Sequence, residues 1–469
     1  MSRSLSRIST SSVVTYKVYK RRFWGLAQLV LLNIVVSWDW IAFAPVSDTA
    51  ATYFHTSESI INWVSTAFLF AFCVAAPFTL YALNRYGPKT SIVVSACLIL
   101  VGNWIKYGGT RANNFGAVML GQLFIGFAQP FVLSAPTSYS NLWFSPLGRT
   151  TATAVASLAN PFGAALGQLI SPVWVSKPSD IPNMILYISI ISSVASVPAF
   201  FIPSKPPSPP SAGAMTDHMT SDSMRHDLHR LFTSLEFYLI FLPFSIYVGF
   251  FNAFSSLLNQ ILEPYSFTET DAGIAGGILI VVGLVCAAVS SPLIDRFKFY
   301  LIYIKIAVPI IGLCYLIFIW APPSHSLGYA FAICAILGAA SFSLVPVVLE
   351  FLVEIYHPLG PELGSTVCWS GGQLLGGIFI VIMDALKDGQ QARPPQNMHR
   401  ALVFQAVVAM LVTPLPLCLG LFGRGGQVRP RRWEVDRSGN NPREEEWEEE
   451  DGDDRALSGG GNGEGRVRI

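Results

Sequence analysis

Charged side chains are scarce in this sequence. Only 13% of the 469 residues are Asp, Glu, Lys or Arg, whereas 52% are hydrophobic and the mean hydropathy is +0.49. A soluble domain carries about 25% charged residues, so this chain could not cover a surface exposed to water. The shortage excludes a soluble enzyme, a secreted disulfide scaffold and a disordered chain, and it indicates an integral membrane protein. The net charge of +1 excludes a nucleic-acid-binding protein that depends on bulk positive charge.

The sequence also lacks the patterns of metal, disulfide and nucleotide sites. Its seven cysteines lie inside apolar runs, without a C-x-x-C pair or a histidine at ligand spacing. None of the seven histidines falls at mid-membrane depth, so a buried axial ligand for haem is missing. No hydrolase, kinase or P-loop motif occurs. We therefore expect no enzyme activity, no metal and no cofactor, and any transport would run on solute or ion gradients.

What the sequence does contain is long apolar runs. A helix needs about 20 apolar residues to cross a bilayer, and alternating ten-residue strand signals are absent. Because backbone groups in hydrocarbon must pair within the segment, the runs predict an all-α protein with twelve transmembrane helices. The expected spans are residues 23–46, 60–83, 90–107, 115–135, 150–175, 183–202, 235–262, 272–294, 299–320, 328–349, 363–384 and 400–423.

The loops between these spans predict the orientation. Loops on the cytoplasmic side carry more Lys and Arg than loops on the other side. With the N-terminus inside, fourteen Lys and Arg residues fall on the inner side and six on the outer side. The outer six are Lys106, Arg111, Lys177, Lys387, Arg393 and Arg400. We therefore expect both termini in the cytoplasm, in the plasma membrane or alternatively in an organelle membrane.

An internal repeat divides the chain into two halves of six helices. Asn84-Arg85 follows the second span and Asp295-Arg296 follows the eighth, at an offset of 211 residues that the first and seventh spans share. Two similar halves around a central cavity are the plan of the major facilitator superfamily. The predicted divisions are a cytoplasmic segment at 1–22, an N-terminal half at 23–202, a flexible cytoplasmic linker at 203–233, a C-terminal half at 234–423 and a disordered cytoplasmic tail at 424–469.

Polar residues inside spans are costly and are therefore the first candidates for a site. Trp38, Asp39 and Trp40 lie in the first span, where a carboxylate beside indole rings could hold a cation. Alternatively, the two tryptophans mark a membrane interface and Asp39 lies at the wet end. Gln129 and Gln373 are embedded in the fourth and eleventh spans. They could bind a hydroxyl or amine of a small ligand, or join two helices.

A second group of polar residues lies near the inner ends of the spans. Glu350 and Glu354 are four residues apart on one helical face. They could form a gate or carry a proton, or they could pair with inner arginines such as Arg296 or Arg149. Arg85, Asp295 and Arg296 follow the second and eighth spans as candidates for inner ion pairs.

Several of these segments together resemble the feline leukaemia virus subgroup C receptor-related transporters, a branch of the major facilitator superfamily. The resemblance covers most of residues 20–423. It is carried by Trp38-Asp-Trp40-Ile, Asn62-Trp63-Val-Ser, Gly102-Asn-Trp104-Ile-Lys106, Gly121-Gln-Leu, Ala128-Gln129, Trp143-Phe144-Ser-Pro146, Leu257-Leu-Asn259, Asp295-Arg296, Glu350-Phe-Leu-Val-Glu354 and Gln373. A sister branch that moves vitamin-like solutes is also similar.

The resemblance implies transport of choline and ethanolamine, with haem export as an earlier assignment for the family. It implies a ligand site with an aromatic wall at Trp40 and two glutamines, Gln129 and Gln373. The family's tyrosine on the seventh helix falls on Asn252, so that wall is missing there, and Tyr247, Phe250 or Phe251 is a possible substitute. The residue before the aromatic wall is usually glutamine and is Asp39 here.

These observations lead us to expect a secondary transporter for a small organic cation or amine that works as a monomer in the lipid bilayer. The alternatives are a haem exporter, a transporter of another vitamin-like solute, and a sensor or scaffold without transport whose tail binds partners. The substrate would be a small molecule, and no nucleic-acid partner is expected.

Overall fold

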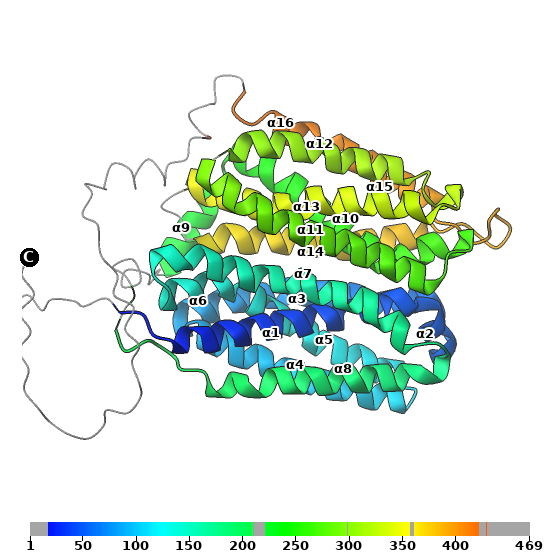
Figure 1. Ribbon diagram of the computed structural model, residues 1–469, viewed down its shortest axis with the longest axis horizontal. Coiled ribbons are helices and arrows are strands. Elements are labelled where there is room, and N and C mark those ends of the chain that lie inside the picture. Colours follow the sequence, from blue (N-terminus) through cyan, green and yellow to red (C-terminus); the bar gives the residue numbers. More distant parts are fainter. Residues whose placement is uncertain are drawn as a thin grey trace, which may run out of the picture.

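The computed structural model describes residues 17–208, 210, 221–297, 299–356, 361–421 and 428. Within these residues the regular structure is helical throughout, in two groups that lie side by side (Figure 1). In the N-terminal group the helices are α1 (Arg21–Ile41), α2 (Ser47–Phe54), α3 (Glu58–Tyr86), α4 (Pro88–Arg111), α5 (Phe115–Leu133), α6 (Ala135–Trp143), α7 (Pro146–Trp174) and α8 (Ile181–Ser196). The C-terminal group contains α9 (Ser221–Phe232), α10 (Leu235–Leu262), α11 (Glu269–Phe297), α12 (Tyr300–Phe318), α13 (Leu327–Tyr356), α14 (Pro361–Ala385), α15 (His399–Val412) and α16 (Pro414–Leu417).

Local residue chemistry explains several of these helix ends. Gly87 has φ +78°, a conformation that costs glycine little, and Pro88 then opens the next helix, so α3 and α4 are separated by a sharp turn. The Asn114 side chain accepts the backbone N–H of Ala117 and caps the start of α5. Pro45 cannot donate a backbone hydrogen bond, and α1 ends four residues before it at Ile41.

Eleven helical spans in the described residues are long and apolar enough to cross a membrane. They match eleven of the twelve expected spans, with shifted ends. The remaining expected span, 150–175, corresponds to α7, which has 29 residues and is long enough at 1.5 Å per residue. Asn160, Pro161 and Gln168 lower the apolar content of α7. The all-α fold is confirmed, and α7 lies in the bundle beside α1 and α11 (Figure 1).

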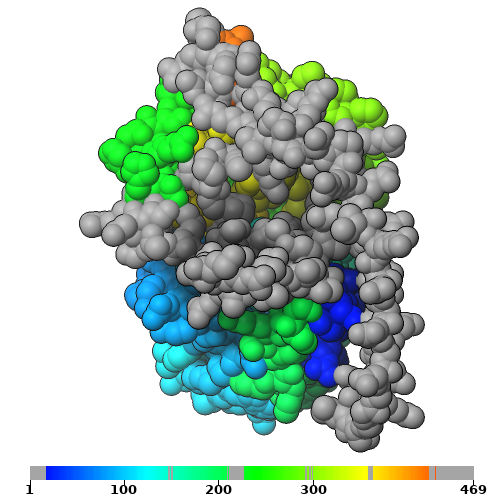
Figure 2. All heavy atoms as spheres, turned by 90° about the vertical axis from the view of Figure 1, so that its left-hand side faces the viewer, coloured from blue at the N-terminus to red at the C-terminus, as the bar shows by residue number. Residues whose placement is uncertain are grey.

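The two halves meet along α7 with α11 and along α3 with α14, and α10 packs along α14 within the C-terminal half (Figure 1). Small residues permit this packing, as is usual between helices in membranes. A methyl group at Gly273 of α11 would lie 2.5 Å from the Gln168 carbonyl oxygen of α7. Viewed from the end where α9 lies, the N-terminal half occupies one side of the molecule and the C-terminal half the other (Figure 2).

Two details differ from the expectations. The segment 203–233, expected to be a flexible linker, contains the helix α9. Lys106, which we counted as an outer-loop residue, is fully buried in α4, so it carries no information on orientation and leaves five residues in the outer set. The charge imbalance between the two sides is therefore larger than the sequence alone suggests. The predicted tail at 424–469 lies outside the described residues except for residue 428.

Candidate functional site

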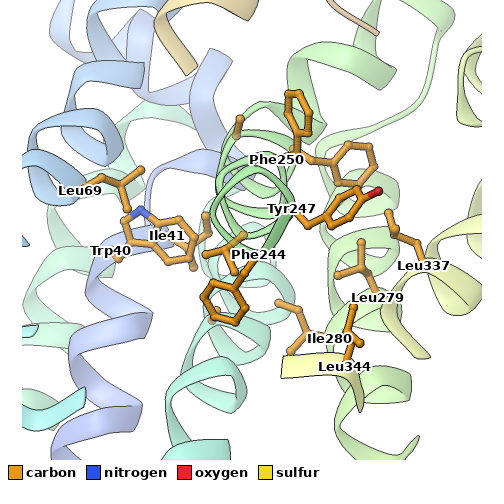
Figure 3. Packing of buried hydrophobic residues seen from close by; sticks show 14 of the residues in the cluster. Trp40, Ile41, Leu69, Phe244, Tyr247, Phe250, Leu279, Ile280, Leu337 and Leu344 are labelled. Carbon is orange, nitrogen blue, oxygen red and sulfur yellow. The ribbon is translucent and has the colours of Figure 1, made fainter. Parts of the chain in front are cut away.

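Trp40 lies where α1 faces the other half of the protein. Its ring stacks on Phe68 of α3, with centroids 6.3 Å apart and an interplanar angle of 23°. Figure 3 shows the indole next to Leu69, on one side of helix α10. Trp40 is only 4% exposed, so it is neither at a wet helix end nor in a lipid-facing belt.

The C-terminal half supplies two amides at the same interface. Asn252 Nδ2 of α10 donates to Gln373 Oε1 of α14 over 2.9 Å, and both side chains are buried. A methyl group at Gly376 would lie 2.8 Å from Asn252 Nδ2 and 3.2 Å from a methyl of Leu69. Since Leu69 also lies next to Trp40 (Figure 3), the structure places Trp40, Asn252 and Gln373 around one junction of α1, α3, α10 and α14.

Gln129 approaches this junction from α5. Three residues before it, Gly126 packs so closely on α3 that a methyl group there would lie 2.8 Å from the Phe68 carbonyl oxygen. Gln129 Oε1 and Trp40 Nε1 are both buried, and neither has a hydrogen-bond partner. A buried polar atom without a partner costs about 1–3 kcal/mol, and such atoms in a native protein call for an explanation. One acceptor and one donor are therefore available to a ligand or a water molecule.

Asp39 points away from this junction. Its carboxylate is fully buried against α4 and α8, where Lys106 Nζ lies 3.4 Å from Oδ1 and Asn103 Nδ2 donates to Oδ2 over 2.7 Å. Ser192 also donates to Oδ2, over 3.3 Å. The expectation that this carboxylate would attract an amine beside Trp40 does not fit the structure, because Lys106 already balances its charge.

Tyr247 lies on the opposite side of α10 from Trp40. Its hydroxyl donates to the Ala409 carbonyl oxygen over 3.1 Å and lies 2.9 Å from Thr413 Oγ1, both within the C-terminal half. Figure 3 shows the ring directed towards Leu279 and Leu337. Tyr247 therefore does not replace the second aromatic wall, because its hydroxyl is held by the end of α15.

A different aromatic pair joins the same two helices that carry the amides. Phe244 of α10 and Trp369 of α14 meet edge to face, with centroids 5.7 Å apart. Trp369 precedes Gln373 by four residues, so both lie on one face of α14, and this face continues to Gly376. The sequence analysis missed this pair. The spacing of Trp369 to Gln373 was a signal that could have identified it.

The structure describes the side chains of only some of the predicted gate residues. Glu354 is buried and Glu350 is half-buried on α13, and both take part in interactions. Arg85 is exposed at the end of α3. The side chains of Asp295, Arg296 and Arg149 lie outside the described residues, so the expected ion pairs with them stay predictions.

The halves are joined at the end of the bundle where α2 lies. We call these residues the closing cluster: Thr49, Glu58, Asn62, Gln260, Glu269, Asp384 and Lys387. Lys387 Nζ lies 2.6 Å from Glu58 Oε2, and Thr49 Oγ1 donates to Glu269 over 3.0 Å. Asn62 exchanges hydrogen bonds with Gln260 and donates to Asp384 over 2.9 Å. Every one of these bonds crosses between the halves, so this end is closed.

We expect Asn62→Ala to open the closing cluster. The substitution removes both hydrogen bonds of Gln260 and one of the two bonds that Asp384 accepts, since the bond from Ser59 remains. The loss costs about 1–3 kcal/mol in the closed state only. Spin labels on the exposed residues His55 and Ser326, one on each half, should then report a longer distance in a larger fraction of molecules. Asn183→Ala, on an exposed residue at the start of α8, is the control. Equal distance distributions in both variants would show that the cluster does not hold the halves together.

A metal site is not evident in the part of the chain that the structure describes. No group of three or more His, Cys, Asp or Glu side chains is arranged there to hold an ion.

The sequence is similar to those of several known membrane proteins. The chain is 29% identical over 385 residues to solute carrier family 49 member A3 of Danio rerio, covering 81% of each chain. It is 26% identical to the choline/ethanolamine transporter FLVCR2 of Homo sapiens, covering 81% of this chain and 74% of that one. It is 28% identical to the choline/ethanolamine transporter FLVCR1 of Felis catus, covering 78% and 68%.

Solved structures show the same fold. A D-xylose-proton symporter superposes with a TM-score of 0.62 at 13% identity, covering 83% of this chain and 96% of that one. A bacterial homologue of the lysosomal transporter Spinster, in an inward-facing conformation, gives a TM-score of 0.64 at 13% identity, covering 85% and 96%. The family description Major Facilitator Superfamily matches residues 29–380, which is most of the helical bundle. The chain therefore belongs to the major facilitator superfamily of membrane transporters.

Proposed function

We propose that this transporter moves a small organic cation or amine that carries a hydroxyl group, of the choline or ethanolamine type. The observation that carries the proposal is that two buried atoms, Trp40 Nε1 of α1 and Gln129 Oε1 of α5, have no hydrogen-bond partner. Helices α1 and α5 pack together in the N-terminal half, and the Asn252–Gln373 pair lies in the other half at the junction described above. A hydroxyl group accepts one hydrogen bond and donates another, so it complements this donor and this acceptor. The names of the related choline/ethanolamine transporters support the same substrate class.

The cationic end of such a substrate suits aromatic rings rather than a carboxylate. A quaternary ammonium carries a diffuse charge that the negative faces of aromatic rings attract. Trp40 supplies one ring from the N-terminal half, and the Phe244–Trp369 pair supplies rings from the C-terminal half. The carboxylate nearest in sequence, Asp39, is paired with Lys106 and turned away. The site thus favours a cation that binds without a counter-ion.

Transport would follow from alternate opening of the two ends of the bundle. The candidate site lies between the halves, and the closing cluster holds one end shut. In this fold family, substrate sites lie near the bilayer midplane and the halves rock about them. The excess of Lys and Arg on the side of the termini supports a cytoplasmic location for both, and hence an outward-facing position for the closing cluster.

The proposal is tested by uptake of labelled choline and ethanolamine in cells that lack their own transport of both. We expect uptake to saturate with increasing substrate concentration. Unlabelled choline should inhibit the uptake of the labelled substrate. A panel of thiamine-like vitamins and haem, tested in the same cells, separates the alternatives. Saturable uptake of a vitamin or haem with none of either amine would replace the proposed substrate class.

We expect Trp369→Ala to raise the KM for choline about tenfold, because it removes one ring of the Phe244–Trp369 pair and a cation–π contact contributes roughly 0.5–2 kcal/mol. Trp369→Phe keeps an aromatic ring and should stay close to the wild type. Trp320→Ala is a matched control, since that tryptophan is 58% exposed near the end of α12. If the KM is unchanged in Trp369→Ala at equal abundance in the membrane, Trp369 does not belong to the substrate site.

A further inference from the structure

An ion pair is buried inside the N-terminal half, where the proposed transport does not use it. Asp39 of α1 and Lys106 of α4 are both fully buried, with 3.4 Å between Lys106 Nζ and Asp39 Oδ1. Charges within membrane spans are costly, and a buried ion pair often contributes little net stability. Its presence therefore points to a role other than stabilisation alone.

The partners of Asp39 come from three different helices. Its carboxylate accepts from Asn103 of α4 over 2.7 Å and from Ser192 of α8 over 3.3 Å. Its backbone carbonyl oxygen accepts from Lys106 Nζ of α4 over 3.2 Å and from Gln122 Nε2 of α5, also over 3.2 Å. One residue of α1 is thus held at both its side chain and its main chain.

The carbonyl that receives these bonds lies in the last turn of α1. The last four carbonyls of a helix have no partner within it, and α1 ends at Ile41, two residues after Asp39. Pro45 prevents the helix from continuing, and the chain turns before α2 begins at Ser47. Lys106 and Gln122 therefore fix the end of α1 from the side, as a capping residue would do from within the chain.

The next residue after the fixed carbonyl is Trp40, the aromatic wall of the proposed site. Because successive helical residues point about 100° apart, holding Asp39 against α4, α5 and α8 directs Trp40 towards Phe68 of α3. We infer that Lys106 and Gln122 are positioning residues for Trp40, acting through the Asp39 carbonyl oxygen. The inference rests on the proposed function, since it concerns the affinity of the same site.

The sharpest variant is Gln122→Leu, which removes a neutral donor to the carbonyl and leaves the ion pair intact. We expect the KM for choline to rise about fivefold at an unchanged maximal rate, equivalent to the loss of one hydrogen bond of about 1 kcal/mol. Asp39→Asn combined with Lys106→Met removes both charges together, so that no lone charge is left buried, and should give about a tenfold rise. Lys305→Met, which removes a half-buried lysine of α12, is the matched control and should leave the KM unchanged.

A double-mutant cycle distinguishes positioning from a general structural effect. In a Trp40→Leu background there is no ring to position, so Gln122→Leu should add no further rise in KM. Hydrogen exchange of residues 38–46 should become faster in Gln122→Leu, and this readout needs no substrate. Additive effects in the cycle, or unchanged exchange at 38–46, would overturn the inference. Absence of amine uptake by the wild-type protein would instead refute the proposed function, and the exchange measurement would still decide the positioning.

Discussion

Replacing Trp40 by Ala should reduce the efficiency of choline uptake about 30-fold or more. The ring stacks on Phe68 at the interface of the halves and is 4% exposed. A desolvated cation–π contact contributes about 2 kcal/mol or more, which corresponds to this factor. The substitution also removes the unpartnered Nε1 donor that we assign to the substrate hydroxyl. Initial rates of labelled choline uptake at several concentrations measure the effect.

The controls for Trp40 separate binding from folding. Trp40→Phe keeps a ring that still attracts a cation but lacks the indole N–H, so it should lose about fivefold, the value of one hydrogen bond of about 1 kcal/mol. Surface labelling establishes equal abundance of each variant in the membrane. Should Trp40→Ala transport choline normally at equal abundance, Trp40 would not be the wall of the site, and the substrate path would lie elsewhere between the halves.

The second large effect concerns folding rather than binding. Gly338 of α13 packs against the backbone of α11, where a methyl group would overlap the Leu279 carbonyl oxygen. Because that neighbour is backbone, Gly338→Val can be accommodated only by separating the two helices. We expect it to destabilise the protein by about 3 kcal/mol or more and to remove most of the folded protein from the membrane. Thermal unfolding of the detergent-purified protein measures the loss.

Another glycine of the same helix provides the comparison. Gly328 lies near the start of α13, and the space around it is open. Gly328→Val should therefore leave the melting temperature within about 2 °C of the wild type, because surface substitutions change stability by about 0.5 kcal/mol or less. Equal melting temperatures for both variants would mean that α11 and α13 do not pack as closely as described.

Much of the architecture could be predicted from the sequence, because a membrane restricts which segments can cross it. A scarcity of charge and long apolar runs identify spans without reference to packing. The span 150–175 shows the limit of this rule. Helix α7 contains Asn160 and Gln168, and it packs against α1 of its own half and α11 of the other, so part of its surface faces protein rather than lipid. Its amide at Gln168 donates to the Ser255 carbonyl oxygen of α10 over 2.8 Å.

The candidate site could be predicted only in part. Trp40, Gln129 and Gln373 stood out by composition, since few polar or indole side chains lie within the spans. Their sequence positions do not say which way each side chain points. Asp39 and Trp40 are adjacent in the sequence, yet one binds Lys106 and the other stacks on Phe68. Tyr247 and Phe244 are less than one helical turn apart on α10, yet only Phe244 pairs with Trp369.

The sequence by itself thus determined the membrane class, the position of nearly every span and a short set of polar residues, because hydropathy acts on each segment separately. The tertiary structure alone decided which of these residues meet. In the folded chain Asp39 pairs with Lys106, and Asn252 donates a hydrogen bond to Gln373. Bonds among Glu58, Asn62, Asp384 and Lys387 join the two halves at one end. These outcomes depend on helix rotation and on contacts between segments more than 60 residues apart in the chain, which no local pattern encodes.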